Sequence, residues 1–436
     1  MERLLEPTSD PTWVLVAEGY DPLREGIHEA RFATSNGFLG VRGGRAVSRG
    51  SRWIEPHRTY IAGLFDIPGP EHPIPELVPA PGWLESRIIP TGVPLVHHPA
   101  EVPSHRTTLD MRRGALFTGC RLIDHPNIAV HVRTIGLVSL KERALGLHVI
   151  NLVVEYGEVE ITLEASFEGL GLGLLSERLE QDLGVWRTRN SNKRLAMAAA
   201  SCLQIDGFDL APTMPGPFVW SWHWKTRAGQ IVSLSRLVVV ARGDSQDEAP
   251  DRVASEKLGI ARQLGWRNLV QEHEAAWSER WQRSDFEVRE DPAAELALRF
   301  AAYHLTSAVN PADEHVSIGA RGLTGDDYHG HVFWDTEIYL LPFYTLTWPE
   351  AARALLMYRF GPLRVQGRRR PAWVGAVPCI LGNQPTLVRR QHRSELSVPM
   401  VTLLKSSAAI RNSTLLRTLR TQCGSTGKQP ETKNSS

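Results

Sequence analysis

Apolar and polar side chains alternate strictly between residues 158 and 167. The apolar positions of this run are Val159, Ile161, Leu163, Ala165 and Phe167. A period of two places them on one face of a β-strand and the intervening Glu, Thr and Ser side chains on the other. Residues 147–155 predict a preceding strand, and Tyr156-Gly157-Glu158 predicts a hairpin turn that joins the two strands.

Short apolar runs of the same kind recur along the first 265 residues. Residues 128–138 and 231–241 are examples, and Gly, Pro, Asp and Asn residues separate such runs. Many short strands with turn residues between them are typical of two packed antiparallel sheets. Residues 1–265 are therefore predicted to form an antiparallel β-sandwich domain.

The period changes from two to that of a helix after about residue 266. Residues 269–283 contain no Gly or Pro, and Trp277 and Trp281 lie four positions apart on one helical face. A second helix is predicted after Asp291-Pro292, with Leu296, Phe300, Tyr303 and Ser307 along one stripe, and a third over residues 348–359. We therefore expect linker helices over residues 266–290 and the beginning of a helical domain over residues 291–359.

Composition places the chain among globular proteins. The 436 residues are 42% hydrophobic, which suits two or three domains with separate cores. The N-terminus lacks a targeting pattern, and no apolar run is long enough to cross a bilayer, so no membrane contact and a cytoplasmic location are expected. The four cysteines are scattered and predict neither a disulfide framework nor a zinc site.

Charge divides the chain near Phe360. Residues 360–436 hold 13 Lys and Arg but two acids, Glu395 and Glu431, whereas residues 1–359 hold 36 basic and 46 acidic side chains. Such a basic tail is one signature of nucleic-acid binding. No aromatic interleaving, recognition helix or zinc spacing accompanies it, so a nucleic-acid partner is the less favoured hypothesis.

Two segments carry candidate chemistry. Residues 29–43 contain an Asn-Gly pair between apolar residues, and the simplest interpretation is a tight hairpin with a buried pair of Arg42 and Glu29. Residues 319–337 form a Gly-rich loop that ends in Phe-Trp-Asp-Thr-Glu. Here Asp335 could simply cap a helix over residues 336–343. Alternatively, Trp334 could stack on the apolar face of a sugar while Asp335 accepts hydrogen bonds from its hydroxyls.

Other candidates are weaker. The alternating glycines of residues 169–174 follow a strand without opening a helix, so a nucleotide site there is not expected. His329 and His331 are two positions apart, but no third metal ligand is visible. Sugar contact or structural hydrogen bonding is the favoured role for both histidines.

Four short stretches resemble signatures of glycoside hydrolase family 65. They are Asn36-Gly37-Phe38-Leu39-Gly40-Val41-Arg42-Gly43, residues 109–114 (Leu-Asp-Met-Arg-Arg-Gly), residues 322–325 (Gly-Leu-Thr-Gly) and residues 330–337 (Gly-His-Val-Phe-Trp-Asp-Thr-Glu). The similarity covers roughly residues 12–359. It implies an N-terminal antiparallel β-sandwich (supersandwich), linker helices and the start of an incomplete (α/α)6 barrel. It also implies that Trp334 and Asp335 bind the non-reducing glucose of an α-linked disaccharide.

The resemblance further implies inverting phosphorolysis or hydrolysis of trehalose, kojibiose, maltose or a similar disaccharide. A glutamic acid protonates the leaving oxygen while phosphate or an activated water attacks from the opposite face. The expected acid motif is absent, so no catalytic residue is assigned, and neither Glu337 nor Asp326 is given that role. No cofactor or metal is expected beyond inorganic phosphate as a possible co-substrate, and a homodimer is possible by resemblance.

The missing motif suggests a lost base in the gene. If residues 372–387 are read one base late with permitted synonymous codons, they can give Leu-Gly-Trp-Arg-Gly-Ala-Leu-Tyr-Pro-Trp-Glu-Ser-Ala-Asp-Thr-Gly, which resembles the family's next sugar-binding element. The hypothesis is a single-base loss between about Arg359 and Ala372, with residues 360–436 out of frame and disordered. The alternative to an enzyme is a truncated, inactive carbohydrate-binding remnant.

Overall fold

The computed structural model describes most of the chain up to helix α6. The described residues are 2–19, 25–43, 58–90, 105–124, 127–245, 248–325 and 327–368. Every strand pair among them is antiparallel. None of the described helices is long and apolar enough to cross a membrane.

The larger sheet of the described chain has ten strands. In spatial order they are β1 (Val14–Glu18), β7 (Arg106–Asp110), β8 (Ala115–Asp124), β9 (Ile128–Val138), β10 (Leu145–Tyr156), β18 (Ile231–Gly243), β14 (Arg194–Ile205), β13 (Leu183–Thr188) and β12 (Leu174–Leu179), with β15 (Phe208–Leu210) paired to β14. The predicted strands over residues 128–138 and 231–241 are confirmed as β9 and β18.

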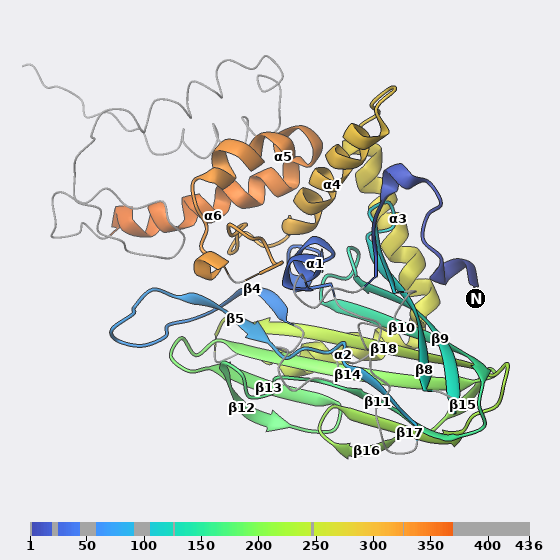
Figure 1. The fold of residues 1–436 in the computed structure, drawn as a ribbon. Helices are drawn as coiled ribbons and strands as arrows, with labels where there is room; N and C mark the ends of the chain where they lie inside the picture. The colour runs from blue at the N-terminus through green and yellow to red at the C-terminus, as the bar shows by residue number, and fades with distance from the viewer. Residues whose placement is uncertain are drawn as a thin grey trace, which may run out of the picture.

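Two four-stranded sheets accompany the larger one. One has the order β16 (Thr213–Gly216), β17 (Val219–Lys225), β11 (Glu160–Ser166) and β6 (Ser86–Pro90), and the other has the order β2 (Thr34–Ser35), β3 (Leu39–Val41), β4 (Thr59–Asp66) and β5 (Glu76–Ala80). Inward-facing residues of β11 and β17, among them Leu163 and Trp222, pack with residues of the larger sheet such as Ile150 and Val238 in one buried core. The predicted sandwich is confirmed (Figure 1).

The predicted hairpin at residues 156–158 is wrong. β10 pairs with β9 and β18, whereas β11 pairs with β6 and β17. The chain therefore crosses from one sheet to the other at Gly157, which has a φ of 115° and lies where an added β-carbon would crowd Asn127 and Ile128. The strand periods were predicted correctly, but pairing is decided by contacts between distant segments.

Two helices cover the outer face of the larger sheet. α2 (Pro250–Leu264) and the beginning of α3 (Trp266–Ser284) pack through Ala254, Leu258 and Val270 against that face. α3 matches the predicted linker helix, and the stacked rings of Trp277 and Trp281 lie 5.9 Å apart. α2 was not anticipated from the sequence.

The remaining helices begin the second domain and lie together on one side of the sheets (Figure 1). They are α4 (Pro292–Ala308), the π-helical turn η5 (Thr336–Leu340), α5 (Leu341–Thr347) and α6 (Pro349–Arg368). The Asp291 carboxylate accepts a hydrogen bond from the Ala294 amide at the start of α4, as its Asp-Pro sequence suggests. Short helical segments at η1 (Glu2–Leu5), η2 (Pro11–Trp13), α1 (Glu25–Arg31) and η4 (Asp327–Gly330) complete the described elements.

Candidate functional site

The Gly-rich loop between α4 and η5 is held against the third sheet. His331 Nε2 lies 3.0 Å from the Pro75 carbonyl oxygen, and His329 Nδ1 lies 3.3 Å from a Glu76 carboxylate oxygen. Gly330 has a φ of 74°, and a β-carbon there would collide with Leu77 of β5. Both histidines therefore have structural contacts, in agreement with one of the roles expected for them.

Trp334 and Asp335 follow this loop on the molecular surface. The Trp334 side chain is 54% exposed, and its ring centroid lies 5.9 Å from that of Tyr339. Asp335 already has helical dihedral angles, and its side chain makes no capping hydrogen bond to η5. The simple helix-cap interpretation of Asp335 is therefore wrong, because the residue stands at the N-cap position of η5 but its carboxylate does not bond to the amides of the helix.

A single arginine holds the turn that carries this pair. From α6, Arg359 Nε lies 2.8 Å from Glu337 Oε1 and Arg359 Nη2 lies 3.1 Å from Glu337 Oε2. Arg359 Nη2 also donates to the Phe333 carbonyl oxygen at 2.7 Å. Both oxygens of Glu337 are thus occupied by a guanidinium, which agrees with leaving Glu337 without a catalytic role. Asp326 lies outside the described residues.

The segment around Asn36 joins the sandwich to the helical domain. The buried Asn36 amide donates to the carbonyl oxygens of Ser139 and Arg143 at 2.7 and 3.0 Å, and its own oxygen accepts from backbone amides of the following turn. Glycines 37 and 40 touch Val309 and Leu323 so closely that a β-carbon would collide with them. The predicted hairpin and the contact between Arg42 and Glu29, 3.4 Å apart, are confirmed, but the pair is partly exposed and not buried as predicted.

Residues 109–114 connect the sandwich to α3. Buried Asp110 accepts hydrogen bonds from the amides of Thr8 and Arg113. The Trp281 indole donates to the Met111 carbonyl oxygen at 2.9 Å. Hence this family-like motif builds an interface between elements, and nothing in its contacts points to a ligand. The glycines of residues 169–174 lead into strand β12, without a helix.

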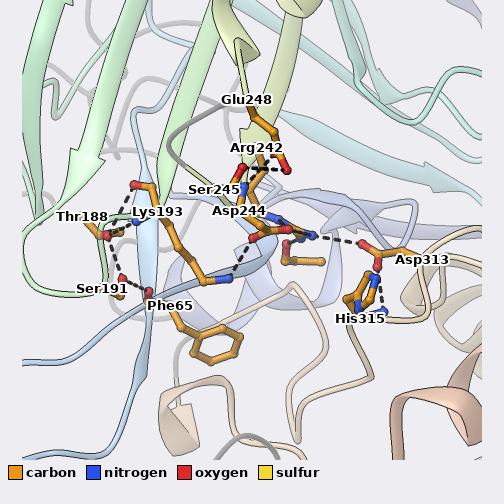
Figure 2. Close-up of polar contacts among 11 residues, drawn as sticks. Phe65, Thr188, Ser191, Lys193, Arg242, Asp244, Ser245, Glu248, Asp313 and His315 are labelled. Carbon is orange, nitrogen blue, oxygen red and sulfur yellow. Dashed lines mark hydrogen bonds and ion pairs between the residues drawn. The ribbon is translucent and has the colours of Figure 1, made fainter. Parts of the chain in front are cut away.

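A cavity of about 510 Å³ lies beside the Phe333 end of the loop. Its walls come from the ends of β4 and β18, the turn between β13 and β14, residues 315–317 and 330–333, and α6. Figure 2 shows Lys193, Arg242 and Asp244 together on the sandwich side, with Asp313 and His315 opposite. Sequence reasoning missed this site because its residues are far apart in the chain and belong to no local motif.

Within the described part of the chain, no group of three or more His, Cys, Asp or Glu side chains converges as metal ligands do. His273 is fully buried between Leu140 and Gly114, and burial lowers its pKa to about 4. It therefore stays neutral as a packing residue.

The sandwich, the linker helix and the surface Trp-Asp pair can be compared with known proteins. Residues 15–280 match the family model of the glycosyl hydrolase family 65 N-terminal domain, and residues 299–376 match the central catalytic domain of the same family. These two matches define the class as carbohydrate-active enzymes. The chain belongs to glycosyl hydrolase family 65.

Individual relatives agree with this assignment. Kojibiose phosphorylase of Caldanaerobacter subterraneus subsp. tengcongensis is 27% identical over 392 residues, which cover 83% of this chain and 50% of the relative. Kojibiose phosphorylase of Escherichia coli is 37% identical over 156 residues, which cover 34% of this chain and 21% of the relative. A solved structure described as a putative kojibiose phosphorylase from human microbiome has the same fold, with a TM-score of 0.73 at 18% identity over 82% of this chain and 49% of that chain. The chain spans about half the length of the kojibiose phosphorylases that match most of it.

Proposed function

We propose that this chain is the N-terminal part of an enzyme that cleaves an α-linked glucose disaccharide with inversion, by phosphate or by water. The observation that carries the proposal is the Trp334-Asp335 pair, which lies exposed after the Gly-rich loop with an indole face and a carboxylate open to a ligand. An indole can stack on the apolar face of a glucose ring, and the adjacent carboxylate can accept hydrogen bonds from two hydroxyls. In this proposal the pair binds the non-reducing glucose.

Cleavage of the glycosidic bond with inversion requires groups other than the Trp334-Asp335 pair. Inversion needs a protonated carboxylic acid at the leaving oxygen and a nucleophile on the opposite face of the sugar. We infer that the acid is a glutamic acid encoded beyond the break near Phe360, because the expected acid motif is absent from the chain and Glu337 is engaged by Arg359. Inorganic phosphate would be a co-substrate of a phosphorylase. Since several relatives are named kojibiose phosphorylase, kojibiose with phosphate is the first pair to assay.

We further propose that one base has been lost between about Arg359 and Ala372. The match to the central catalytic domain ends at residue 376, close to the end of this window. A new read of the DNA from the codon of Tyr358 to the next stop tests the idea. One extra base followed by a long open frame with a further sugar-binding element supports it, and an unchanged frame contradicts it.

The protein from the corrected frame provides the functional test. We expect phosphate-dependent release of glucose 1-phosphate from kojibiose, or phosphate-independent release of glucose from one of the other disaccharides. Trp334→Ala and Asp335→Asn should each lower kcat/KM by about 100-fold or more, since each removes a direct sugar contact. Phe208→Ala changes an aromatic side chain that is 80% exposed on β15 and should leave kcat/KM unchanged. Full activity of both site variants would contradict the assignment.

A carbohydrate-binding remnant is the second candidate, because the described chain carries the sugar-binding pair without an assigned acid. Under this alternative, the 436-residue chain would bind glucosides without turnover. Residues 369–436 of the basic tail, which motivated a nucleic-acid hypothesis, lie outside the described residues. The beginning of the tail belongs to helix α6, which ends at Arg368, so the expected disorder from residue 360 is wrong there.

A further inference from the structure

The cavity beside Phe333 is separate from the Trp334 and Asp335 side chains, which do not line it. Its volume of about 510 Å³ falls within the range of about 300–1,000 Å³ that is usual for small-molecule sites. One wall belongs to the sandwich and the other to the loop and α6, so that the site exists only where the two domains meet.

The charged groups of the cavity neutralise one another. Lys193 Nζ lies 2.9 Å from Asp244 Oδ1, and Arg242 Nη2 lies 2.9 Å from Asp244 Oδ2 (Figure 2). Arg242 also contacts Asp313 at 3.2 Å and donates to the Ala62 carbonyl oxygen. Glu248 adds a further carboxylate to the lining. With its cations already paired, the cavity offers no excess positive charge to an anion such as phosphate.

Hydrogen-bonding capacity nevertheless remains in the lining. An ammonium group has three N–H donors, and one of those on Lys193 is directed to Asp244. Its remaining N–H donors can bind the hydroxyl groups of a ligand, because Lys193 lines the cavity.

Aromatic rings supply the apolar part of the lining. Phe65 comes from the end of β4, Phe333 from the loop and Tyr358 from α6, and all three line the cavity. Rings combined with carboxylates and a lysine match the two faces of a sugar, one apolar and one hydroxylated. A wholly apolar ligand would leave the polar groups unpaired.

We propose that this cavity is a second saccharide site, which takes a neutral mono- or disaccharide between the sandwich and the helical domain. This second site goes beyond the proposed function, because saccharide binding in the cavity does not require the groups that cleave the glycosidic bond. Lys193 donates hydrogen bonds to sugar hydroxyls, and Phe65 and Tyr358 contact the ring.

The test uses the 436-residue chain carrying Trp334→Ala, so that the proposed glucose pair no longer contributes. Binding of glucose, kojibiose, maltose and trehalose is measured by saturation-transfer NMR, and hydrogen exchange reports protection of residues 63–67, 191–193 and 315–317. We expect saccharide binding that persists in this background and falls about tenfold on Lys193→Met.

A matched control exists for this substitution. Lys257 also pairs with a carboxylate, that of Glu142 at 2.7 Å, but does not line the cavity. Lys257→Met should leave binding unchanged. The proposal is overturned if Trp334→Ala alone abolishes binding, if Lys257→Met weakens binding as much as Lys193→Met, or if inorganic phosphate displaces the sugar. Loss of all binding on Trp334→Ala would still be consistent with the proposed role of Trp334 and Asp335 in binding glucose.

Discussion

Gly114 illustrates how one small residue fixes a junction between elements. Its φ is 63°, and an added β-carbon would overlap the indole nitrogen of Trp277 on α3. Gly114→Ala should therefore lower the free energy of unfolding by about 3 kcal/mol, from backbone strain together with overpacking. Urea titration followed by tryptophan fluorescence measures the change.

Gly207 provides the control for this prediction. Its φ is 90°, but no atom lies within 4 Å of an added β-carbon. Gly207→Ala should cost only about 1 kcal/mol, the strain of a left-handed conformation. Equal losses for the two variants would show that backbone strain alone is responsible and that contact with Trp277 is unimportant.

The burial of His148 makes the free energy of unfolding depend on pH. Burial, with a smaller effect of Arg236, lowers the pKa of His148 from 6.5 to about 3. The unfolded chain therefore binds a proton as the pH falls below about 6.5, whereas the folded chain does not until about pH 3. The contribution of His148 is fully present above pH 6.5 and decreases toward pH 3, by about 1.4 kcal/mol per pH unit.

Replacement of His148 by Gln should reduce the slope of unfolding free energy against pH between pH 6.5 and 4. The slope will not vanish, since burial also lowers the pKa values of His273 and His304 to about 4. His223 is exposed, so His223→Gln should preserve the slope. Urea titrations at half-unit pH intervals compare the three proteins, and an unchanged slope in His148→Gln would refute the argument.

At the scale of elements, α6 positions the turn that bears the candidate sugar pair. Arg359 contacts both Phe333 and Glu337, on either side of Trp334-Asp335. Arg359→Met should free this turn and raise amide hydrogen exchange over residues 333–340 by about tenfold, which corresponds to about 1.4 kcal/mol of local opening. Hydrogen-exchange mass spectrometry measures this change in exchange rate.

Arg353, on the same helix, is the matched control. It pairs with Glu314, but its side chain is 45% exposed, whereas that of Arg359 is 11% exposed. An exposed ion pair contributes little, so Arg353→Met should leave exchange at residues 333–340 unchanged. If both variants behaved alike, the turn would not depend on the buried pair.

At the scale of the molecule, Trp348 links three parts of the chain. The guanidinium of Arg280 on α3 lies 4.5 Å from its ring centroid, and that of Arg143, between β9 and β10, lies 5.6 Å from it. Trp348 itself precedes α6 and packs in the core shared by α4, α5 and α6. Sandwich, linker and helical domain thus meet at a single indole.

Trp348→Ala should loosen the helical domain more than the sandwich. We expect limited proteolysis within residues 299–360 to become about tenfold faster or more, because a buried aromatic ring and two cation–π contacts are lost together. Trp266→Ala removes a local contact with Arg267 and should have a much smaller effect. Equal cleavage of both variants would argue against an interdomain role.

Local patterns predicted much of this architecture. The alternation at residues 158–167 gave β11, and the Asp-Pro start and apolar stripe gave α4, because both periods follow from backbone geometry alone. The segment of α2, which buries Ala254 and Ala261, was missed because the change from strands to helices was placed at residue 266, after this helix ends. Helical structure at 336–343 was expected, but its π-helical first turn was not.

The sequence by itself determined the strand and helix periods, the Asn36 turn and the family-like Trp334-Asp335 pair, since each depends on neighbouring residues. Only the tertiary structure decided that β10 and β11 belong to different sheets, that Arg359 engages Glu337, and that Lys193, Arg242 and Ser317 share a cavity. Those outcomes depend on contacts between residues far apart in the chain, whose formation requires the whole fold.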